Sequence, residues 1–143
     1  MKTRGDARPS PSTPAVAYPG AGPPDATAVR TSAQARRAVR RALASCLPRR
    51  PSQVDDLMLV ASELVTNAQR HAGGVTAFAI GLGRDSVTIS VGDASPRTPQ
   101  YTFHQELRPG GFGWPIVLHL CRQVLLDVRS DGKTVHAVVP FDR

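Results

Sequence analysis

The feature that most constrains the fold of this chain is a change in the period of its apolar residues. Between residues 32 and 72, apolar side chains recur every three to four positions, which is the pattern of amphipathic helices. After residue 75, short segments alternate apolar and polar residues, which is the pattern of strands with one buried face. Helices stacked on one face of a sheet bury both kinds of surface. We therefore predict an α+β fold, a two-layer α/β sandwich.

The expected order of elements is helix, helix, strand, strand, helix, strand, strand. We expect a mixed, mostly antiparallel sheet of four or more strands, covered on one face by the three helices. The alternating segments are residues 76–82, 87–91, 126–128 and 135–139, and residues 27–29 fit a further short strand. The residues that start or stop the helices are Thr31 or Ser32 and Pro48 for the first, Ser52 and Gly73–Gly74 for the second, and Pro115 at the first position of the third.

The N-terminal segment differs in composition from the rest of the chain. Residues 1–24 hold six of the 13 prolines, and small residues fill most of the remainder. Such a segment cannot bury enough apolar surface to order itself. We predict a disordered tail over residues 1–25 and, in a chain of 143 residues, a single folded domain over residues 26–143.

The charge balance bears on possible partners. Lys and Arg number 18 against 11 Asp and Glu, a net charge of +7. The densest group, Arg36, Arg37, Arg40 and Arg41, lies on the polar face of the first helix, where a solvated surface is the simplest interpretation. No aromatic residues are interleaved with it, so we do not expect nucleic-acid binding, although a basic DNA-binding domain stays open as an alternative. An acidic partner or an anionic ligand also fits this surface.

The expected location is the cytoplasm. No apolar run approaches the roughly 20 residues that span a membrane, and no apolar segment of a secretory signal follows the basic N-terminus. Cys46 and Cys121 lie in apolar surroundings far apart in sequence, so we expect reduced core thiols rather than a disulfide or a metal site.

The second helix carries a polar stripe that its core does not require. Glu63, Asn67 and His71 are four residues apart and share one helix face. An Asn side-chain oxygen suits Mg²⁺, and a Glu one turn away can deprotonate a nucleophile beside that metal. An ordinary polar helix face would also give this spacing.

Two further segments have the residue types of a nucleotide site. Asp93 leaves a buried strand, where its carboxylate can accept a hydrogen bond from an exocyclic amine such as that of adenine. The start of a turn explains an Asp at this position equally well. Gly110–Gly113 precedes a helix, where glycines let the backbone approach a phosphate. The 18 residues 94–111 between them lack periodicity, which is typical of a lid or binding loop. Gly132-Lys133-Thr134 lies in a hairpin and is not a phosphate-binding P-loop.

In this order the three motifs resemble the Bergerat ATP-binding fold of the GHKL superfamily, which includes histidine-kinase catalytic domains and type II topoisomerases. Within it, the chain is most similar to anti-sigma-factor serine/threonine kinases and to small stand-alone ATP-binding regulators of actinobacteria. The resemblance spans about residues 27–140 and rests on residues 63–71, 92–96 and 111–113, with a looser match at residues 132–135.

The resemblance implies ATP and Mg²⁺ as cofactors and a role for each matched residue. Asn67 would coordinate the Mg²⁺ that bridges the phosphates, and Glu63 would be the catalytic base that accepts a proton from a serine hydroxyl of a partner protein. Arg70 and His71 would reach phosphate or pack beside it. The nucleotide would be bound by Asp93 at the adenine amine, Pro96 at the border of that motif, Gly111 and Gly113 around the phosphates, and Thr134 beside the adenine, with residues 94–110 as the lid.

The function implied is transfer of the γ-phosphate of ATP to Ser or Thr of an antagonist protein, by a regulator that also binds a sigma factor and can form a homodimer. The alternative is an ATP-dependent interaction module without catalysis. Trp114 and Pro115, which follow the second glycine, favour that alternative because the family has small or aliphatic residues there. Arg97 and Arg108 are candidates for contact with the γ-phosphate.

Overall fold

The computed structural model describes residues 29–97 and 113–142. Within these residues three helices accompany one four-stranded sheet, with the strand order β2-β3-β5-β4. The predicted tail, residues 1–25, lies outside the described residues. The elements, in chain order, are α1 (Ser32–Ala42), α2 (Ser52–His71), β2 (Val75–Leu82), β3 (Ser86–Asp93), α3 (Gly113–Leu120), β4 (Gln123–Arg129) and β5 (Gly132–Pro140).

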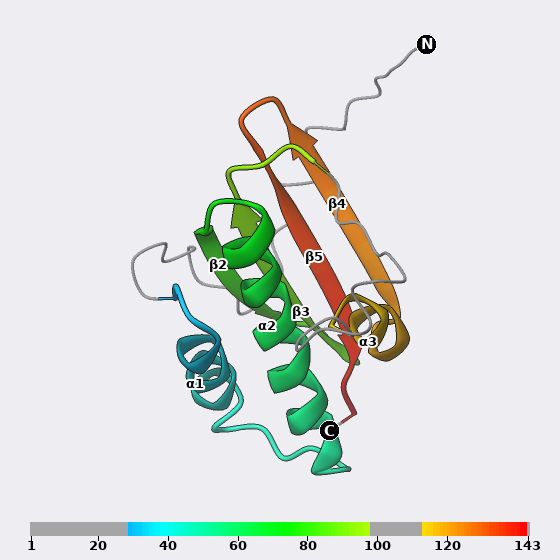
Figure 1. The fold of residues 1–143 in the computed structure, drawn as a ribbon. Helices are drawn as coiled ribbons and strands as arrows, with labels where there is room; N and C mark the ends of the chain where they lie inside the picture. Colours follow the sequence, from blue (N-terminus) through cyan, green and yellow to red (C-terminus); the bar gives the residue numbers. More distant parts are fainter. Residues whose placement is uncertain (1–28, 98–112, 143) are drawn as a thin grey trace.

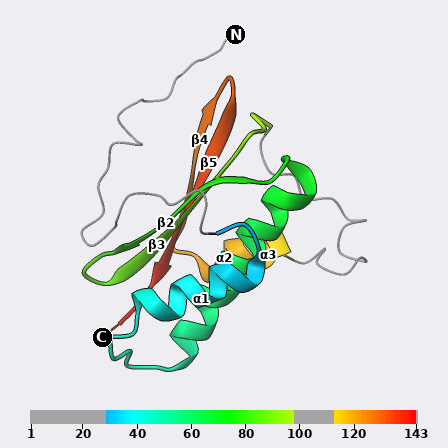
Figure 2. The same cartoon turned by 90° about the vertical axis from the view of Figure 1, so that its left-hand side faces the viewer.

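The molecule has two layers, as the change of period predicts. All three helices lie on the same face of the sheet, which is seen nearly edge-on in Figure 2. The long helix α2 contacts β2, β3 and β5 and packs against both α1 and α3, so it is the centre of the helical layer (Figure 1). The α+β sandwich is thus confirmed, and within the described residues every strand pair is antiparallel.

The sheet consists of two hairpins joined along one seam. Strands β2 and β3 form the first hairpin, β4 and β5 form the second, and β3 pairs with β5 between them. The apolar residues of the inner strands face the helices and are almost fully buried. They are Val87, Ile89 and Val91 of β3 and Val135, Ala137 and Val139 of β5. This alternation decides which side chains of the same strands can reach the helical layer.

The first helix begins where the sequence predicts, and its end differs. The Thr31 hydroxyl accepts a hydrogen bond from the Gln34 backbone N–H, and the Gln34 side chain accepts from the Thr31 backbone N–H, which makes a capping box. The helix ends at Ala42, well before Pro48, because Leu43 leaves the helical conformation. The proline therefore prevents re-entry into helix and does not itself end α1.

Two predicted helix starts also need correction. Pro51 occupies the N-cap position of α2, so Ser52 is the first helical residue and makes no capping bond through its side chain. Helix α3 begins at Gly113, which puts Pro115 in the first turn rather than at the first position. A proline is tolerated in both places because the first N–H groups of a helix have no intrahelical acceptor. Helix α2 ends at His71, just before the predicted Gly73–Gly74 stop.

The other predictions for the described chain concern Val29, the thiols and the membrane. Val29 is buried in the core but belongs to no strand, and residues 27 and 28 lie outside the described part. Both Cys46 and Cys121 are free, and burial raises the pKa of Cys121 to about 11, so this thiol stays protonated and unreactive. Among the described helices, none has the length and apolar character needed to cross a bilayer.

Candidate functional site

Helix α2, which carries the polar stripe, ends close to the end of strand β3. Glu63 and Asn67 are one helical turn apart, so both project from the same side of the helix. After α2, Gly73 and Gly74 adopt positive φ angles of 79° and 108° and turn the chain directly into β2. Val75, the first residue of β2, is the Cα partner of Asp93. Two of the three sequence motifs are therefore brought to one end of the molecule.

Glu63 is a half-buried carboxylate with one buried oxygen that has no hydrogen-bond partner in the described structure. Its Oε1 atom is inaccessible to solvent and makes no hydrogen bond within the described structure. Burial raises the pKa of Glu63, and the positive charge of Arg70 partly offsets this effect. A buried acceptor normally has a partner, so an unpartnered one is suited to receive a proton donor from outside the chain. A raised pKa also brings a carboxylate closer to the range of an effective general base.

Asn67 is half-buried, one turn from Glu63. In the described part of the chain, no group of three or more His, Cys, Asp or Glu side chains is arranged to hold a metal ion. Mg²⁺ is commonly bound by one or two protein oxygens together with the phosphates of a nucleotide. The side-chain oxygen of Asn67 fits that mode of binding, in which the nucleotide supplies most of the ligands.

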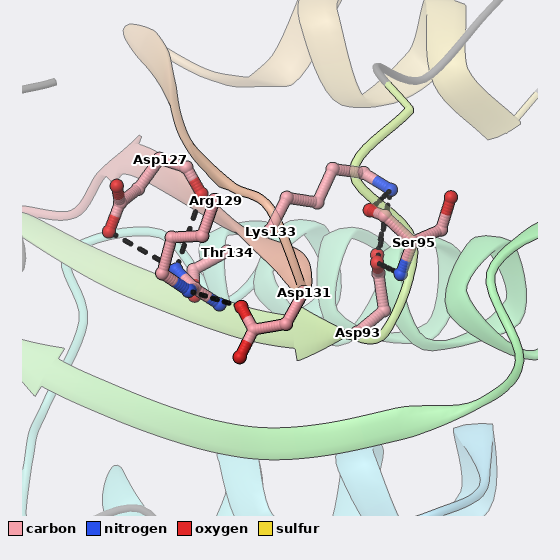
Figure 3. A network of polar contacts seen from close by, with 7 residues as sticks. All are labelled: Asp93, Ser95, Asp127, Arg129, Asp131, Lys133 and Thr134. Carbon is pink, nitrogen blue, oxygen red and sulfur yellow. Dashed lines mark hydrogen bonds and ion pairs between the residues drawn. The ribbon is translucent and has the colours of Figure 1, made fainter. Parts of the chain in front are cut away.

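Asp93 is engaged by a neighbouring lysine on the adjacent strand. The Lys133 Nζ atom lies 3.0 Å from Asp93 Oδ2 and 3.1 Å from Oδ1, and both side chains are almost fully buried, with 6% and 5% exposure (Figure 3). The Ser95 backbone N–H also donates to Asp93 Oδ1 at 2.9 Å. These contacts hold the carboxylate in one orientation. They also satisfy most of its capacity to accept hydrogen bonds.

Gly132 permits this pairing by letting two backbones approach each other. A Cβ atom at this position would lie 2.2 Å from the carbonyl oxygen of Asp93 and 3.2 Å from the Cα of Ala94. Both are backbone atoms, which cannot rotate away as the end of a long side chain can. The absence of a side chain at Gly132 therefore allows the start of β5 to approach the end of β3, where Lys133 meets Asp93.

Thr134 lies on the other face of the sheet from Asp93. Lys133 has the same parity in β5 as the core residue Val135, so Thr134 points away from the helices. Its hydroxyl accepts a hydrogen bond from Arg129 at 3.3 Å, and Arg129 also contacts Asp127 (Figure 3). The structure therefore does not bring Thr134 to Asp93, the carboxylate predicted to bind adenine. Lys133 holds the position beside it.

The helix-free face carries a second polar cluster that the sequence did not suggest. Asp127 is 4% exposed and pairs with Arg129 at 3.3 Å, and the Ser90 hydroxyl and His136 Nδ1 are hydrogen-bonded at 2.7 Å. Burial lowers the pKa of His136, an effect that Asp127 opposes and Arg129 reinforces. The His136 Nε2 atom is buried and unpartnered in the described structure. Since Ser90 is bonded to Nδ1 while Nε2 has no acceptor, the cluster does not form a nucleophilic triad.

The remaining predicted residues occupy less informative positions. Arg70 is exposed on the last turn of α2, and Pro96 is exposed shortly after β3. Gly113 is the first residue of α3, so it stands where backbone N–H groups are available to a phosphate. Gly111 and the side chain of His71 lie outside what the structure describes, as does most of the predicted lid.

Comparison with known families decides the identity of the domain. A family model described as a histidine kinase-like ATPase domain matches residues 25–139. The chain belongs to this family. A search of curated proteins found no similar sequence.

The family assignment confirms the resemblance stated for the motifs. The matched region of the histidine kinase-like ATPase domain includes the stripe of α2, the Asp93 strand end, the start of α3 and the β4–β5 hairpin. It also covers Lys133, which the sequence analysis did not single out as a site residue. The signal was present: Lys133 alternates in phase with Val135 and Ala137, and an ionisable residue on the buried face of a strand needs a partner.

Proposed function

We propose that the chain is an ATP- and Mg²⁺-binding regulator of the anti-sigma-factor serine/threonine kinase type, which transfers the γ-phosphate of ATP to Ser or Thr of an antagonist protein. The observation that carries the proposal is the buried, unpartnered Oε1 atom of Glu63, one helical turn from Asn67. This arrangement supplies a proton acceptor and a neutral oxygen ligand side by side. Membership of an ATPase family supports the choice of cofactor.

Each residue would contribute through position and charge. Glu63 would accept the proton of the attacking hydroxyl at Oε1, which has no internal donor to displace. Asn67 would hold Mg²⁺, which neutralises phosphate charge when bound. The backbone at the start of α3, including Gly113, would face the phosphates. Catalysis of this kind depends mainly on positioning and electrostatic stabilisation.

A nucleotide-dependent interaction module without catalysis is the second candidate. The observation that favours it is the composition of the first turn of α3. Pro115 has no backbone N–H, and Trp114 packs against the hydrophobic core. The first turn of α3 therefore offers the phosphates fewer backbone N–H donors than a turn without proline would offer. Such a site would bind nucleotide without holding the γ-phosphate for transfer.

The partners follow from the type of regulator. We propose a sigma factor, an antagonist protein, or both, with the cytoplasm as the compartment where they meet. The exposed arginines of α1, which include Arg37 and Arg40, give the domain a basic surface suited to an acidic protein. A homodimer is also proposed, and we do not propose nucleic acid as a ligand.

The test is phosphotransfer from radiolabelled ATP to purified candidate antagonist proteins. We expect Mg²⁺-dependent labelling of one of them by the wild-type chain. Glu63→Gln should bind ATP with unchanged affinity in calorimetry and lose transfer by about 10²–10⁴-fold. Asp55→Asn removes an exposed carboxylate from the same helix and is the matched control, with transfer unchanged.

Three results would separate the candidates. ATP binding without labelling of any partner would support the interaction module. Full transfer by Glu63→Gln would remove this residue from the role of base. A chain that binds no adenine nucleotide in the presence of Mg²⁺ would overturn both candidates.

A further inference from the structure

Lys133 is engaged inside the protein by two hydrogen bonds and an ion pair. An ammonium group has three N–H donors, and the Lys133 Nζ atom has three acceptors within 3.2 Å. Two of them are the carboxylate oxygens of Asp93, at 3.0 and 3.1 Å, and the third is the Ser95 carbonyl oxygen at 3.2 Å. Lys133 therefore contacts the first and the last residue of the segment 93–95, where the chain leaves β3.

The carboxylate of Asp93 is engaged on both oxygens in the same network. A carboxylate offers about four lone-pair positions. Lys133 and the Ser95 N–H both donate hydrogen bonds to Oδ1, and the Lys133 ammonium lies 3.0 Å from Oδ2 as its ion-pair partner. The acceptor positions that remain are on Oδ2, beside this charged group and in a side chain that is only 5% exposed. An exocyclic amine approaching Asp93 would meet an acceptor that already has a charged donor.

We propose that Lys133 is a specificity-determining residue of the nucleotide site, which competes with the exocyclic amine of adenine for the carboxylate of Asp93. The proposal rests on the proposed function, because it assumes that an adenine nucleotide binds at this strand end. For the adenine amine to donate a hydrogen bond to Asp93 without competition, the Lys133 ammonium must move away from Asp93. The ion pair therefore lowers the affinity for ATP relative to the same site without the lysine.

Geometry and charge make the lysine an effective competitor. The two residues are Cα partners across the β3–β5 seam, so their separation is fixed by the sheet. Gly132 keeps the backbones of the two strands close at this point. A charged donor forms a stronger hydrogen bond to a carboxylate than a neutral amine does, and the buried surroundings increase the difference. An incoming amine must therefore replace a better partner.

The test is calorimetry with ATP and Mg²⁺ on the full chain and on variants at residue 133, all at the same neutral pH. Lys133→Met removes the ammonium and keeps an unbranched side chain, and we expect about tenfold to a hundredfold tighter binding. Lys133→Gln retains one neutral donor and should lie between Met and wild type. Lys133→Arg keeps a charged donor and should not bind more tightly than wild type.

Two comparisons isolate the competition from other effects. Inosine triphosphate has a carbonyl oxygen in place of the adenine amine, so it cannot use Asp93 in the same way, and its affinity should not rise in Lys133→Met. Arg122→Met removes a positive charge from an exposed ion pair with Asp85 and should leave ATP affinity within about twofold of wild type. Melting temperatures without nucleotide establish that each variant is folded, and Lys133→Gln carries the test if Lys133→Met is unfolded.

The possible results have distinct meanings. Tighter ATP binding by the Met and Gln variants, without a gain for inosine triphosphate, supports the competition. Equal ATP affinity in wild type and both variants overturns it while the proposed function stands, and weaker binding by the variants overturns it by making Lys133 a direct ligand contact. Equal gains for both nucleotides also overturn it. A wild type and variants that all ignore ATP would overturn the proposed function and this inference together.

Discussion

The two carboxylates at the ends of the proposed site, Glu63 and Asp93, have opposite surroundings. Within the described structure, Glu63 is half-buried and its Oε1 atom is buried without a hydrogen-bond donor, and burial raises the pKa of Glu63. Asp93 is more deeply buried, yet it has a lysine and a backbone N–H at its oxygens. One carboxylate is left able to accept a proton from outside, whereas the other is already engaged by donors from within the chain.

In the proposed site, this difference would let one residue type serve two purposes. A general base needs an unoccupied acceptor and a pKa that is not too low, and Glu63 has both. A recognition group needs a fixed orientation, which the contacts of Asp93 with Lys133 and Ser95 supply. This fixed orientation reduces the access of an external donor to Asp93, because the donors that orient the carboxylate also occupy its oxygens.

Removing the carboxylate of Asp93 should have the largest effect on stability. Asp93→Leu leaves the Lys133 ammonium buried without its counter-charge, and we expect a loss of about 3–5 kcal/mol in the free energy of unfolding. Urea denaturation measures this loss. The double variant Asp93→Leu/Lys133→Met should recover most of it, because neither charge then remains buried. Equal stability of the single and double variants would mean that the pair is not coupled as the distances indicate.

Separating the backbones of β3 and β5 next to Asp93 should have an intermediate effect on stability. Gly132→Ala places a Cβ 2.2 Å from the Asp93 carbonyl oxygen, so the strands must separate. We expect a loss of about 2–3 kcal/mol, measured by urea denaturation. Ser130→Ala in the same turn is exposed and serves as the control, with a change within about 0.5 kcal/mol. A neutral Gly132→Ala would contradict the close approach of β3 and β5.

Neutralising Glu63 should have the smallest effect on the free energy of unfolding. It should stabilise the protein, whereas the other two changes destabilise it. A carboxyl whose pKa is raised by folding destabilises the folded state once it ionises, from its ordinary pKa upward. Glu63→Gln should therefore be more stable than wild type by about 1 kcal/mol at neutral pH. The advantage should vanish below the ordinary pKa of Glu and grow as pH rises through the raised one. Asp55→Asn should show no such gain. If Glu63→Gln were less stable than wild type at neutral pH, the ionised Glu63 carboxylate would not destabilise the folded state.

The fold was largely predictable because its elements have local signals. The switch from a helical period to alternation located α1, α2 and the four strands, Pro115 marked α3, and Thr31 with Gln34 marks the first helix start. The corrections concern helix ends: Pro51 takes the N-cap position predicted for Ser52, and α1 ends at Ala42 rather than at Pro48. At such ends the local preferences of adjacent residues are similar, and tertiary packing decides between them.

The candidate site was only partly predictable, because half of it depends on pairing across the seam. The stripe of α2 follows from spacing within one helix. The contact between Asp93 and Lys133 joins residues 40 apart in sequence, and it depends on the β3–β5 register, which no local pattern specifies. Thr134 was assigned to the adenine from the family resemblance, whereas the parity with Val135 places Lys133 on the helix side.

The arrangement of the sheet as two hairpins also bears on how the protein folds. Each hairpin closes between neighbours in sequence, whereas the β3–β5 seam requires the chain to bring distant segments together. Contacts of long sequence separation carry a larger loop-closure entropy and form more slowly. We expect the seam, and with it the Asp93–Lys133 contact at its end, to assemble after both hairpins. The nucleotide site would then mature in the last step of folding, and a newly synthesised chain would become competent for its ligand only when the whole domain is complete.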